Sequence, residues 1–283
     1  MCSSDLYTGT TTISGGRFEV ATLANGGVAS PLGASSAAAG NLVLSGGTLA
    51  FTGAGSATTD RGFTVGAASG SLEVTQAGGT ATFTGDVAAA GTFHKAGAGT
   101  LALGVGSGTS RTFTTLSVDD GRLTLTNAAA AVSATTIVGD AAGFSGQLSL
   151  GGSSQLTALG PVLLGNAASS VGSLVVAGSS VLTGSSYMAV GNAGSGTLTV
   201  RDAASVTVAF DLNVADLAGA SGSLVLEGGT VAASGPVFLG KNSNSIGSAT
   251  VSGGSLAGSQ YMTLGRFAAS EGAMAVSGGQ IGR

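Results

Sequence analysis

Apolar and polar residues alternate in short stretches through the second half of the chain. In Leu148-Ser149-Leu150, two apolar residues flank a polar one. Alternation with a period of two puts the outer residues on one face of a β-strand and the middle residue on the other. Equivalent stretches recur at a nearly constant spacing, at Leu174-Val175-Val176, Leu198-Thr199-Val200, Leu224-Val225-Leu226, Ala249-Thr250-Val251 and Met274-Ala275-Val276. The pattern predicts a half-buried strand in every unit of about 25 residues.

Two further positions recur with the same spacing. Ahead of each alternating strand, a hydrophobic residue precedes a small one: Val138-Gly139, Leu164-Gly165, Val190-Gly191, Val214-Ala215, Leu239-Gly240 and Leu264-Gly265. After each alternating strand comes another apolar residue: Leu156, Leu182, Val206, Val231, Leu256 and Ile281. Each unit therefore offers about three strands separated by Gly, Ser and Asn turns. Three short strands cannot enclose a core alone, but stacked units can form a continuous one.

The repeat predicts an all-β fold, a right-handed parallel β-helix with three strands and about 25 residues per rung. Successive rungs are expected to rise about 4.8 Å, the spacing of neighbouring strands. A helical alternative is disfavoured because Val, Thr and Gly occupy the positions that helix formers would need. The segment 160–165 (GPVLLG) returns at 235–240 (GPVFLG), which indicates that three rungs were duplicated together.

The regularity of the repeat divides the chain into three parts. Residues 1–6 do not fit the pattern and are predicted to be a foreign or mis-called leader. Residues 7–136 show the same succession of strand, glycine turn and strand with more variable turns, and are predicted to form irregular rungs. Residues 137–283 are predicted to form six regular rungs, the last cut short at Arg283. We expect one continuous solenoid rather than two separate domains.

Composition supports a folded, turn-rich chain. Glycine accounts for 52 of 283 residues and charged residues for 8%, whereas hydrophobic residues make up 43%. A disordered chain would lack that apolar content, and collagen would need far more than 3 prolines. The net charge of −4, with the basic residues scattered, disfavours nucleic acid as a partner. Cys2 is the only cysteine, which excludes a disulfide within the chain, and no apolar run is long enough for a transmembrane helix.

The sequence resembles two repeat families of exported bacterial proteins. Residues 7–16 (YTGTTTISGG), 23–49 and 95–103 (KAGAGTLAL) are similar to the autotransporter-associated β-strand repeat of type V secretion passengers. Residues 137–283 resemble the rung-length repeat shared by such passengers and by proteins with a PEP-CTERM sorting tail. The resemblance implies export, a β-helical passenger, and display on or release from the cell surface. It brings no catalytic residues with it.

The acidic residues are the first candidates for chemistry, because some parallel β-helices cleave polysaccharides with paired carboxylates. The densest pair is Asp119-Asp120, but Gly121 follows it, and a structural turn is the better interpretation. Asp211 and Asp216 can approach each other, yet no histidine or arginine near them suggests a reaction. We therefore predict no catalytic, cofactor-binding or metal-ligating residues.

A file of polar residues follows the small residue of each rung. Its members are Asp140, Asn166, Asn192 and Asp216, continued by Lys241 and Arg266. We interpret it as a ladder of turn residues, because Asn and Asp tolerate the left-handed conformation and bond their own backbone.

Two other candidate sites are weaker still. His94 is the only histidine, and with no acid close in sequence it is expected at the surface or a rung edge rather than in a triad or metal site. A flat threonine array for ice or crystalline polysaccharide would need a file with one threonine in every rung. Thr157 and Thr183 align, and we expect the next rungs to break the file.

The sequence thus predicts a structural or adhesive passenger or stalk segment of a secreted bacterial surface protein, without catalysis or cofactor. A carbohydrate-active β-helix with a site in segment 50–136 is the main alternative, and a self-associating matrix unit joined end to end is the third. The expected partners are surface glycans or other cell-surface and matrix proteins. We expect an extracellular location, with attachment to the outer membrane through parts outside this chain.

Overall fold

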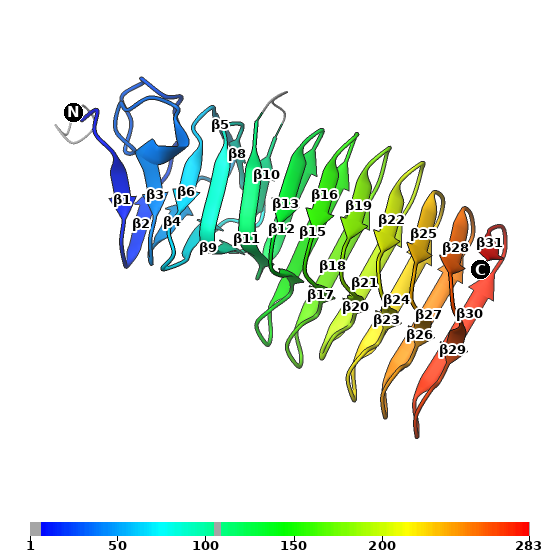
Figure 1. Ribbon diagram of the computed structural model, residues 1–283. Coiled ribbons are helices and arrows are strands. Elements are labelled where there is room, and N and C mark those ends of the chain that lie inside the picture. The colour runs from blue at the N-terminus through cyan, green and yellow to red at the C-terminus, as the bar shows by residue number, and fades with distance from the viewer. Residues whose placement is uncertain (1–6, 105–108, 283) are drawn as a thin grey trace.

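The computed structural model describes residues 7–104 and 109–282, and it is a β-solenoid of stacked rungs (Figure 1). Strands from successive rungs pair in parallel and form three columns that run along the molecule. The described residues contain one short 3-10 helix, η2 (Ala39–Asn41), and no helix long and apolar enough to cross a membrane. These observations confirm the predicted all-β solenoid, in which each sequence repeat forms one rung.

Column 1 and column 2 share two long strands, β9 (Val87–Ala96) and β11 (Arg111–Val118), which pass through both. The other strands of column 1 are β1 (Thr11–Ile13), β3 (Leu42–Leu44), β6 (Phe63–Val65), β13 (Ala129–Val132), β16 (Gln155–Ala158), β19 (Val181–Gly184), β22 (Ser205–Val208), β25 (Thr230–Ala233), β28 (Ser255–Gly258) and β31 (Gln280–Gly282). Those of column 2 are β2 (Arg17–Val20), β4 (Thr48–Phe51), β7 (Gly70–Val74), β14 (Thr136–Val138), β17 (Val162–Leu164), β20 (Met188–Val190), β23 (Leu212–Val214), β26 (Val237–Leu239) and β29 (Met262–Leu264).

Column 3 forms a sheet of its own, opposite the corner where the other two columns meet. Its strands are β5 (Ser56–Thr59), β8 (Thr80–Phe83), β10 (Thr100–Leu103), β12 (Gly121–Thr126), β15 (Ser145–Gly151), β18 (Val171–Val176), β21 (Ser195–Val200), β24 (Ser221–Leu226), β27 (Ile246–Val251) and β30 (Glu271–Val276). The ladder from β12 to β15 crosses residue 136 without a break. The predicted boundary at residues 136/137 therefore falls inside a continuous ladder, and the leader predicted at residues 1–6 lies outside the described residues.

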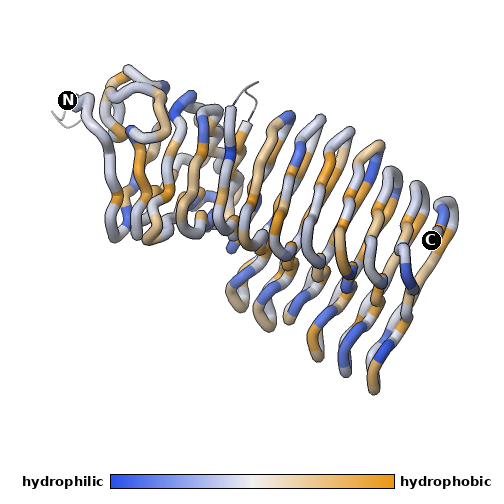
Figure 2. The backbone as a smooth tube through the Cα atoms, in the orientation of Figure 1, coloured by the Kyte–Doolittle hydropathy of each residue, from blue (hydrophilic) through white to orange (hydrophobic). Residues whose placement is uncertain are grey.

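The core is a set of apolar files running along the solenoid. Leu148 pairs with Leu174, and the file continues through Leu198 and Leu224, all with none of their surface exposed. Burying one such side chain stabilises the fold by about 1.5–3 kcal/mol. The middle residues of these strands are partly exposed, as alternation predicted. Apolar segments accordingly recur in every rung along the chain trace (Figure 2).

Aromatic rings add to the aliphatic files in the N-terminal half. Phe93 has none of its surface exposed and lies with its ring centroid 5.3 Å from that of Phe63 and 5.7 Å from that of Phe113. Phe83 packs edge-on against Phe63 at 5.5 Å. Phe63, Phe93 and Phe113 come from successive rungs, so the ring stack ties the irregular rungs together in the same way as the leucine file does further on.

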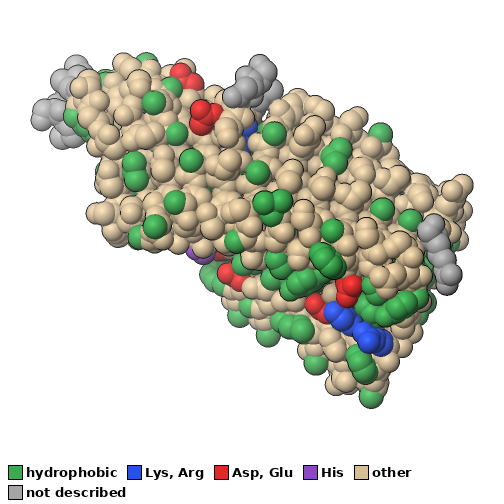
Figure 3. Space-filling model, in the orientation of Figure 1, with side chains coloured by type: hydrophobic (Ala, Val, Ile, Leu, Met, Phe, Trp, Pro, Cys, Tyr) green, Lys and Arg blue, Asp and Glu red, His purple; other side chains and the backbone are tan. Residues whose placement is uncertain are grey.

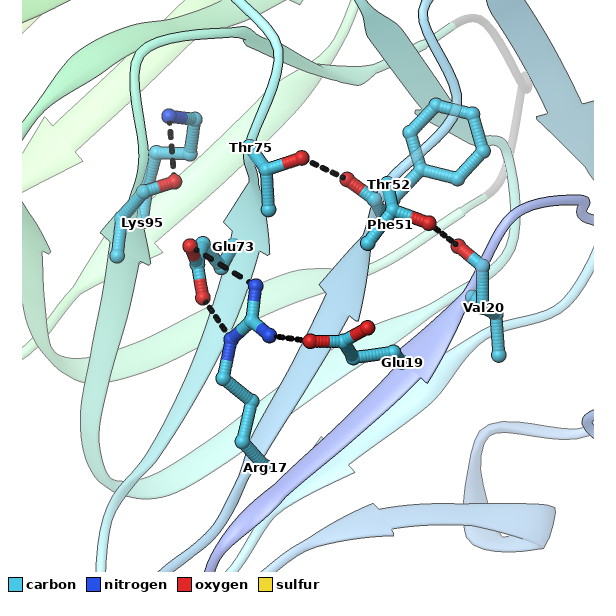
Figure 4. A network of polar contacts seen from close by, with 9 residues as sticks. Arg17, Glu19, Val20, Phe51, Thr52, Glu73, Thr75 and Lys95 are labelled. Carbon is cyan, nitrogen blue, oxygen red and sulfur yellow. Dashed lines mark hydrogen bonds and ion pairs between the residues drawn. The ribbon is translucent and has the colours of Figure 1, made fainter.

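Polar side chains bridge the irregular rungs on the outer face. The guanidinium of Arg17 donates to Glu73, with 2.7 Å between Nε and Oε2, and also contacts Glu19 (Figure 4). Thr52 and Thr75 each donate from Oγ1 to a backbone carbonyl of the preceding rung at 3.3 Å. The hydroxyl of a threonine on a parallel strand thus reinforces the ladder already made by the backbone.

The regular rungs carry an arm that projects from the corner between columns 2 and 3 (Figure 1). Each arm leaves through the small residue noted in the sequence and returns through a second glycine, as Gly165 and Gly172 do. The first residue has a left-handed backbone, with φ of +61° at Gly165. A Cβ on Gly172 would lie 2.0 Å from the carbonyl oxygen of Val138 and 2.2 Å from the nitrogen of Gly165. Only glycine lets the two chains of the arm approach this closely.

Candidate binding pocket

The outer side of column 2 faces the arms, and the angle between them holds a pocket of about 550 Å³. We call it the corner pocket. It is lined by Ser186, Tyr187, Phe210, Asp211, Asn213, Asp216, Leu217, Lys241 and Asn242. Residues 186–187 and 210–211, which precede strands β20 and β23, form one wall. Asn213, the outward residue of β23, forms the floor, and the arm residues 216–217 and 241–242 form the other wall.

The floor of the corner pocket is a polar residue where its neighbours are apolar. Asn213 pairs in register with Ala189 on one side and with Phe238 on the other. Its side chain is 1% exposed, and its Oδ1 atom has no hydrogen-bond partner among the described residues. An unpaired buried acceptor costs about 1–3 kcal/mol, so this atom is suited to accept a hydrogen bond from a bound molecule.

Apolar side chains at the rim are left in solvent. Phe210 is 60% exposed and Leu217, on the opposite wall, is 45% exposed. Tyr187 lies beside them and is half-buried. Figure 3 shows hydrophobic, acidic and basic side chains gathered at this lower corner of the C-terminal half. Such a mixture of aromatic surface and a few polar groups is typical of small-molecule sites.

The charges of the corner pocket are partly neutralised within it. Lys241 Nζ lies 2.9 Å from Asp216 Oδ1, and Asp216 is 8% exposed. Burial raises the pKa of the Tyr187 hydroxyl, and the negative charge of Asp216 raises it further. Asp211 adds a second carboxylate to the wall. The structure thus brings together Asp211 and Asp216, which the sequence suggested were able to meet.

A basic and aromatic cluster continues from the corner pocket into the next rungs. The guanidinium carbon of Arg266 lies 4.9 Å from the ring centroids of both Phe238 and Phe267. Lys241 Nζ lies 5.6 Å from the centroid of Phe238, and the ring of Tyr261 meets Phe238 edge-on at 5.8 Å. Cations over ring faces are attracted by the negative face of the ring, so these side chains hold one another in place.

The predicted polar ladder is present, but the reason given for it is wrong. Asn166 Nδ2 donates to Asp140 Oδ1 at 2.7 Å, and Asn192 Nδ2 donates to Asn166 Oδ1 at 2.9 Å. These side chains therefore bond to the neighbouring rung rather than to their own backbone. The left-handed residue is the small one before them, such as Gly191 with φ of +81°. The file stabilises stacking, and the glycine makes the turn.

The acids of segment 50–136 hold loops and neighbouring rungs in place. Asp60 accepts from the backbone of Gly26, Asp86 from that of Ser110, and Asp120 from that of Ser145. Glu73 forms the ion pair with Arg17, and Asp119 accepts a short hydrogen bond from the hydroxyl of Ser117. Asp119-Asp120 lie in the bend before Gly121, which has φ of +64°. No group of three or more His, Cys, Asp or Glu able to hold a metal occurs in the described residues.

His94 has an acidic partner that the sequence did not reveal. Its Nδ1 lies 2.9 Å from Asp119 Oδ2, because side chains one rung apart become neighbours when rungs stack. The side chain of His94 is 32% exposed, and the hydrogen bond to Asp119 raises its pKa. Ser117 bonds to Asp119 rather than to His94, so the three residues do not form a nucleophile, base and orienting acid in sequence.

Lys95 is another residue whose position the sequence did not reveal. It points into the core with none of its surface exposed. Its Nζ donates to the carbonyl oxygens of Ala96, Gly97 and Asp120 at 2.9, 2.6 and 2.8 Å. Burial lowers its pKa from 10.5 to about 8. With all three donors occupied by backbone carbonyls, Lys95 closes the end of a rung.

The threonine file of column 1 is longer than the sequence suggested. Thr157 pairs with Thr183, and Thr183 pairs with Thr207, which extends the file by one rung before Ala232 ends it. The expectation that the file ends after Thr183 is therefore wrong. Three threonines still make only a short row, since the next rungs place Ala232 and Ala257 there.

One comparison with known proteins gives a clear similarity. Over 172 residues, covering 54% of this chain, the sequence is 42% identical to a Brucella suis biovar 1 (strain 1330) protein named adhesin BmaC autotransporter. This chain is similar to part of an autotransporter adhesin. It spans 5% of that protein's length. The similarity and the β-solenoid together confirm the resemblance to autotransporter passengers inferred from the repeats. No family model matches the chain, and no solved structure matches it significantly.

Proposed function

We propose that this chain is a structural and adhesive segment of a bacterial surface protein, carried on the passenger of an autotransporter. The observation that supports this most strongly is the continuous parallel ladder combined with the similarity to an adhesin. A solenoid in which each rung contacts only its neighbours makes an extended scaffold, and its length grows with the number of repeats. Such a scaffold suits a protein that must reach away from the cell.

The way the charged groups are used supports a non-catalytic role. The acids of segment 50–136 form hydrogen bonds that hold turns and neighbouring rungs in place. The ammonium of Lys95 donates to backbone carbonyl oxygens. These groups are therefore engaged in the scaffold rather than converging on a reacting bond. The extracellular location and the contact with surface molecules belong to the same proposal.

Attachment of coated particles tests the adhesive part. Beads carrying the purified chain are expected to bind epithelial monolayers or matrix-coated wells more than beads carrying albumin. Beads carrying the heat-unfolded chain serve as the matched control, because they have the same composition without the solenoid. Equal binding by folded chain and albumin would contradict the adhesive function. Small-angle scattering tests the scaffold: rungs rising about 4.8 Å each should give a rod roughly 50–60 Å long.

A further inference from the structure

We propose that the corner pocket binds a neutral oligosaccharide made of pyranose rings. This inference rests on the adhesive function proposed above and gives that function a ligand class and a location. The pocket volume of about 550 Å³ lies within the range of about 300–1,000 Å³ that small-molecule sites occupy. Three features of its lining favour a sugar: the exposed aromatic surface, the buried acceptor and the balance of charge.

The aromatic wall offers a platform for a sugar ring. Phe210 is 60% exposed, although burying a phenylalanine side chain stabilises a fold by about 1.5–3 kcal/mol. The exposed ring is therefore a cost to the free molecule that a ligand covering it would remove. The face of an aromatic ring carries partial negative charge, and the C–H groups on one face of a pyranose carry partial positive charge. Tyr187, on the same wall, adds a second ring with a hydroxyl.

The floor supplies a hydrogen-bond acceptor for a sugar hydroxyl. Asn213 lines the pocket at 1% exposure, and its Oδ1 atom is unpartnered among the described residues. A hydrogen bond donated by a ligand hydroxyl would satisfy this oxygen, whereas an apolar ligand would leave it unpaired. The site therefore discriminates in favour of polar molecules. The rim side chains must rotate for a ligand to reach the floor, and side-chain rotamers interconvert on fast timescales.

The charges of the pocket favour a neutral sugar over an acidic one. Its described lining holds two carboxylates, Asp211 and Asp216, and one ammonium, Lys241. The ammonium is already paired with Asp216 at 2.9 Å. A sulfate or uronate would meet a net negative pocket whose cation is engaged. Carboxylates accept hydrogen bonds from neutral hydroxyls, and amides both accept and donate them, without that repulsion.

An extended peptide fits the same surface less well. Peptides commonly bind by adding a strand to an exposed sheet edge. The strands beneath the pocket are internal to the column: β23 pairs with β20 on one side and with β26 on the other. The backbone of this face is therefore occupied by the ladder, and recognition there depends on side chains alone.

A glycan array with the full chain tests the proposal. The array presents cellotetraose, chitotetraose, laminaritetraose and lacto-N-tetraose as neutral probes, and a heparin tetrasaccharide as the acidic contrast. Calorimetry then measures the affinity for the best neutral probe in three variants. Phe210→Ala removes the platform, and Asn213→Leu removes the acceptor while keeping the number and branching of the side-chain heavy atoms. Phe144→Ala is the matched control, because Phe144 is a 50% exposed ring on another arm, outside the pocket lining.

The expected result is binding of at least one neutral probe, weakened roughly tenfold or more by Phe210→Ala and by Asn213→Leu, and unchanged by Phe144→Ala. Asn213→Leu should melt at the same temperature as the wild type or higher, because it replaces an unpaired buried amide. Binding that survives both pocket variants, binding of heparin alone, or binding of no probe would overturn the proposal. Beads that still attach to matrix in those cases would leave the adhesive function standing, and beads that no longer attach would refute both.

Discussion

The neck of the projecting arm leaves little room for an added methyl group. At Gly191 the backbone has φ of +81°, and a Cβ would lie 2.0 Å from the carbonyl oxygen of Ser221 in the next rung. Gly191→Ala therefore combines two costs. A left-handed conformation costs a non-glycine residue about 1–2 kcal/mol, and overpacking of a closely packed site costs about 1–3 kcal/mol. We expect a loss of about 2–5 kcal/mol.

Two other glycines separate these costs. Gly219 has φ of +76° with no atom within 4 Å of its Cβ position, so Gly219→Ala should show the conformational cost alone. Gly184, on β19, has no positive φ, and the nearest atom to its Cβ position is 3.4 Å away. Gly184→Ala should change the stability by no more than about 0.5 kcal/mol. Ala215 occupies the place of Gly191 in the following rung with φ of +66°, so the arm tolerates a methyl group and the variant should fold.

Urea unfolding followed by circular dichroism measures the order of the three variants. With a slope of about 3 kcal/mol/M, Gly191→Ala should lower the midpoint by about 1 M. Repeat proteins can unfold in parts. In Gly191→Ala, amide hydrogen exchange should therefore show that the arm at 191–196 loses its protection before the rest of the chain. If Gly191→Ala is no less stable than Gly219→Ala, the predicted steric clash is refuted. If Gly191→Ala, Gly219→Ala and Gly184→Ala are equally stable, both the conformational cost and the overpacking cost are refuted.

Three further predictions concern the N-terminal half. Because the pKa of Lys95 is lowered to about 8, the unfolded chain holds more protons than the folded chain between pH 8 and 10.5. The free energy of unfolding should therefore rise across that range by up to about 3 kcal/mol. Urea titrations at several pH values should show that Lys95→Met flattens the rise. The pKa of His94 is higher in the folded chain than in the unfolded chain. The protonated imidazole therefore contributes its full stabilisation at pH values below the unfolded-state pKa, and this contribution is lost as the pH rises through the folded-state pKa. His94→Gln should therefore lose more stability at pH 5.5 than at pH 8.5; an equal loss would contradict the pairing with Asp119. Phe93→Ala should cost about 3–5 kcal/mol by chemical unfolding, with Phe93→Leu losing much less.

The period of the sequence was sufficient to predict the solenoid. Alternation in stretches such as Leu148-Ser149-Leu150 predicts which residues face the core, because side chains on a strand must alternate. The nearly constant spacing of these stretches then places like strands beside like strands, and the backbone ladder forms in register. The small residue after Val190 was visible as a marker, since the corner it occupies is repeated in every rung.

The tertiary structure alone decided which residues meet across rungs and around corners. His94 and Asp119 are one rung apart in the sequence, and only stacking makes them neighbours at 2.9 Å. Lys95 looks like a surface lysine in the sequence, but it alternates onto the core face and finds three carbonyl oxygens at the end of the rung.

The corner pocket depends on two arms. Each leaves column 2 through a small left-handed residue, Ala215 or Gly240, and returns through a glycine that packs against it, Gly222 or Gly247. Alternation marks Asn213 as an outward residue, and the folded arm buries it to 1% exposure. Local patterning thus determined the strands and the core of this protein. The contacts between rungs determined its pocket, because such contacts depend on how the corners fold back over the sheet.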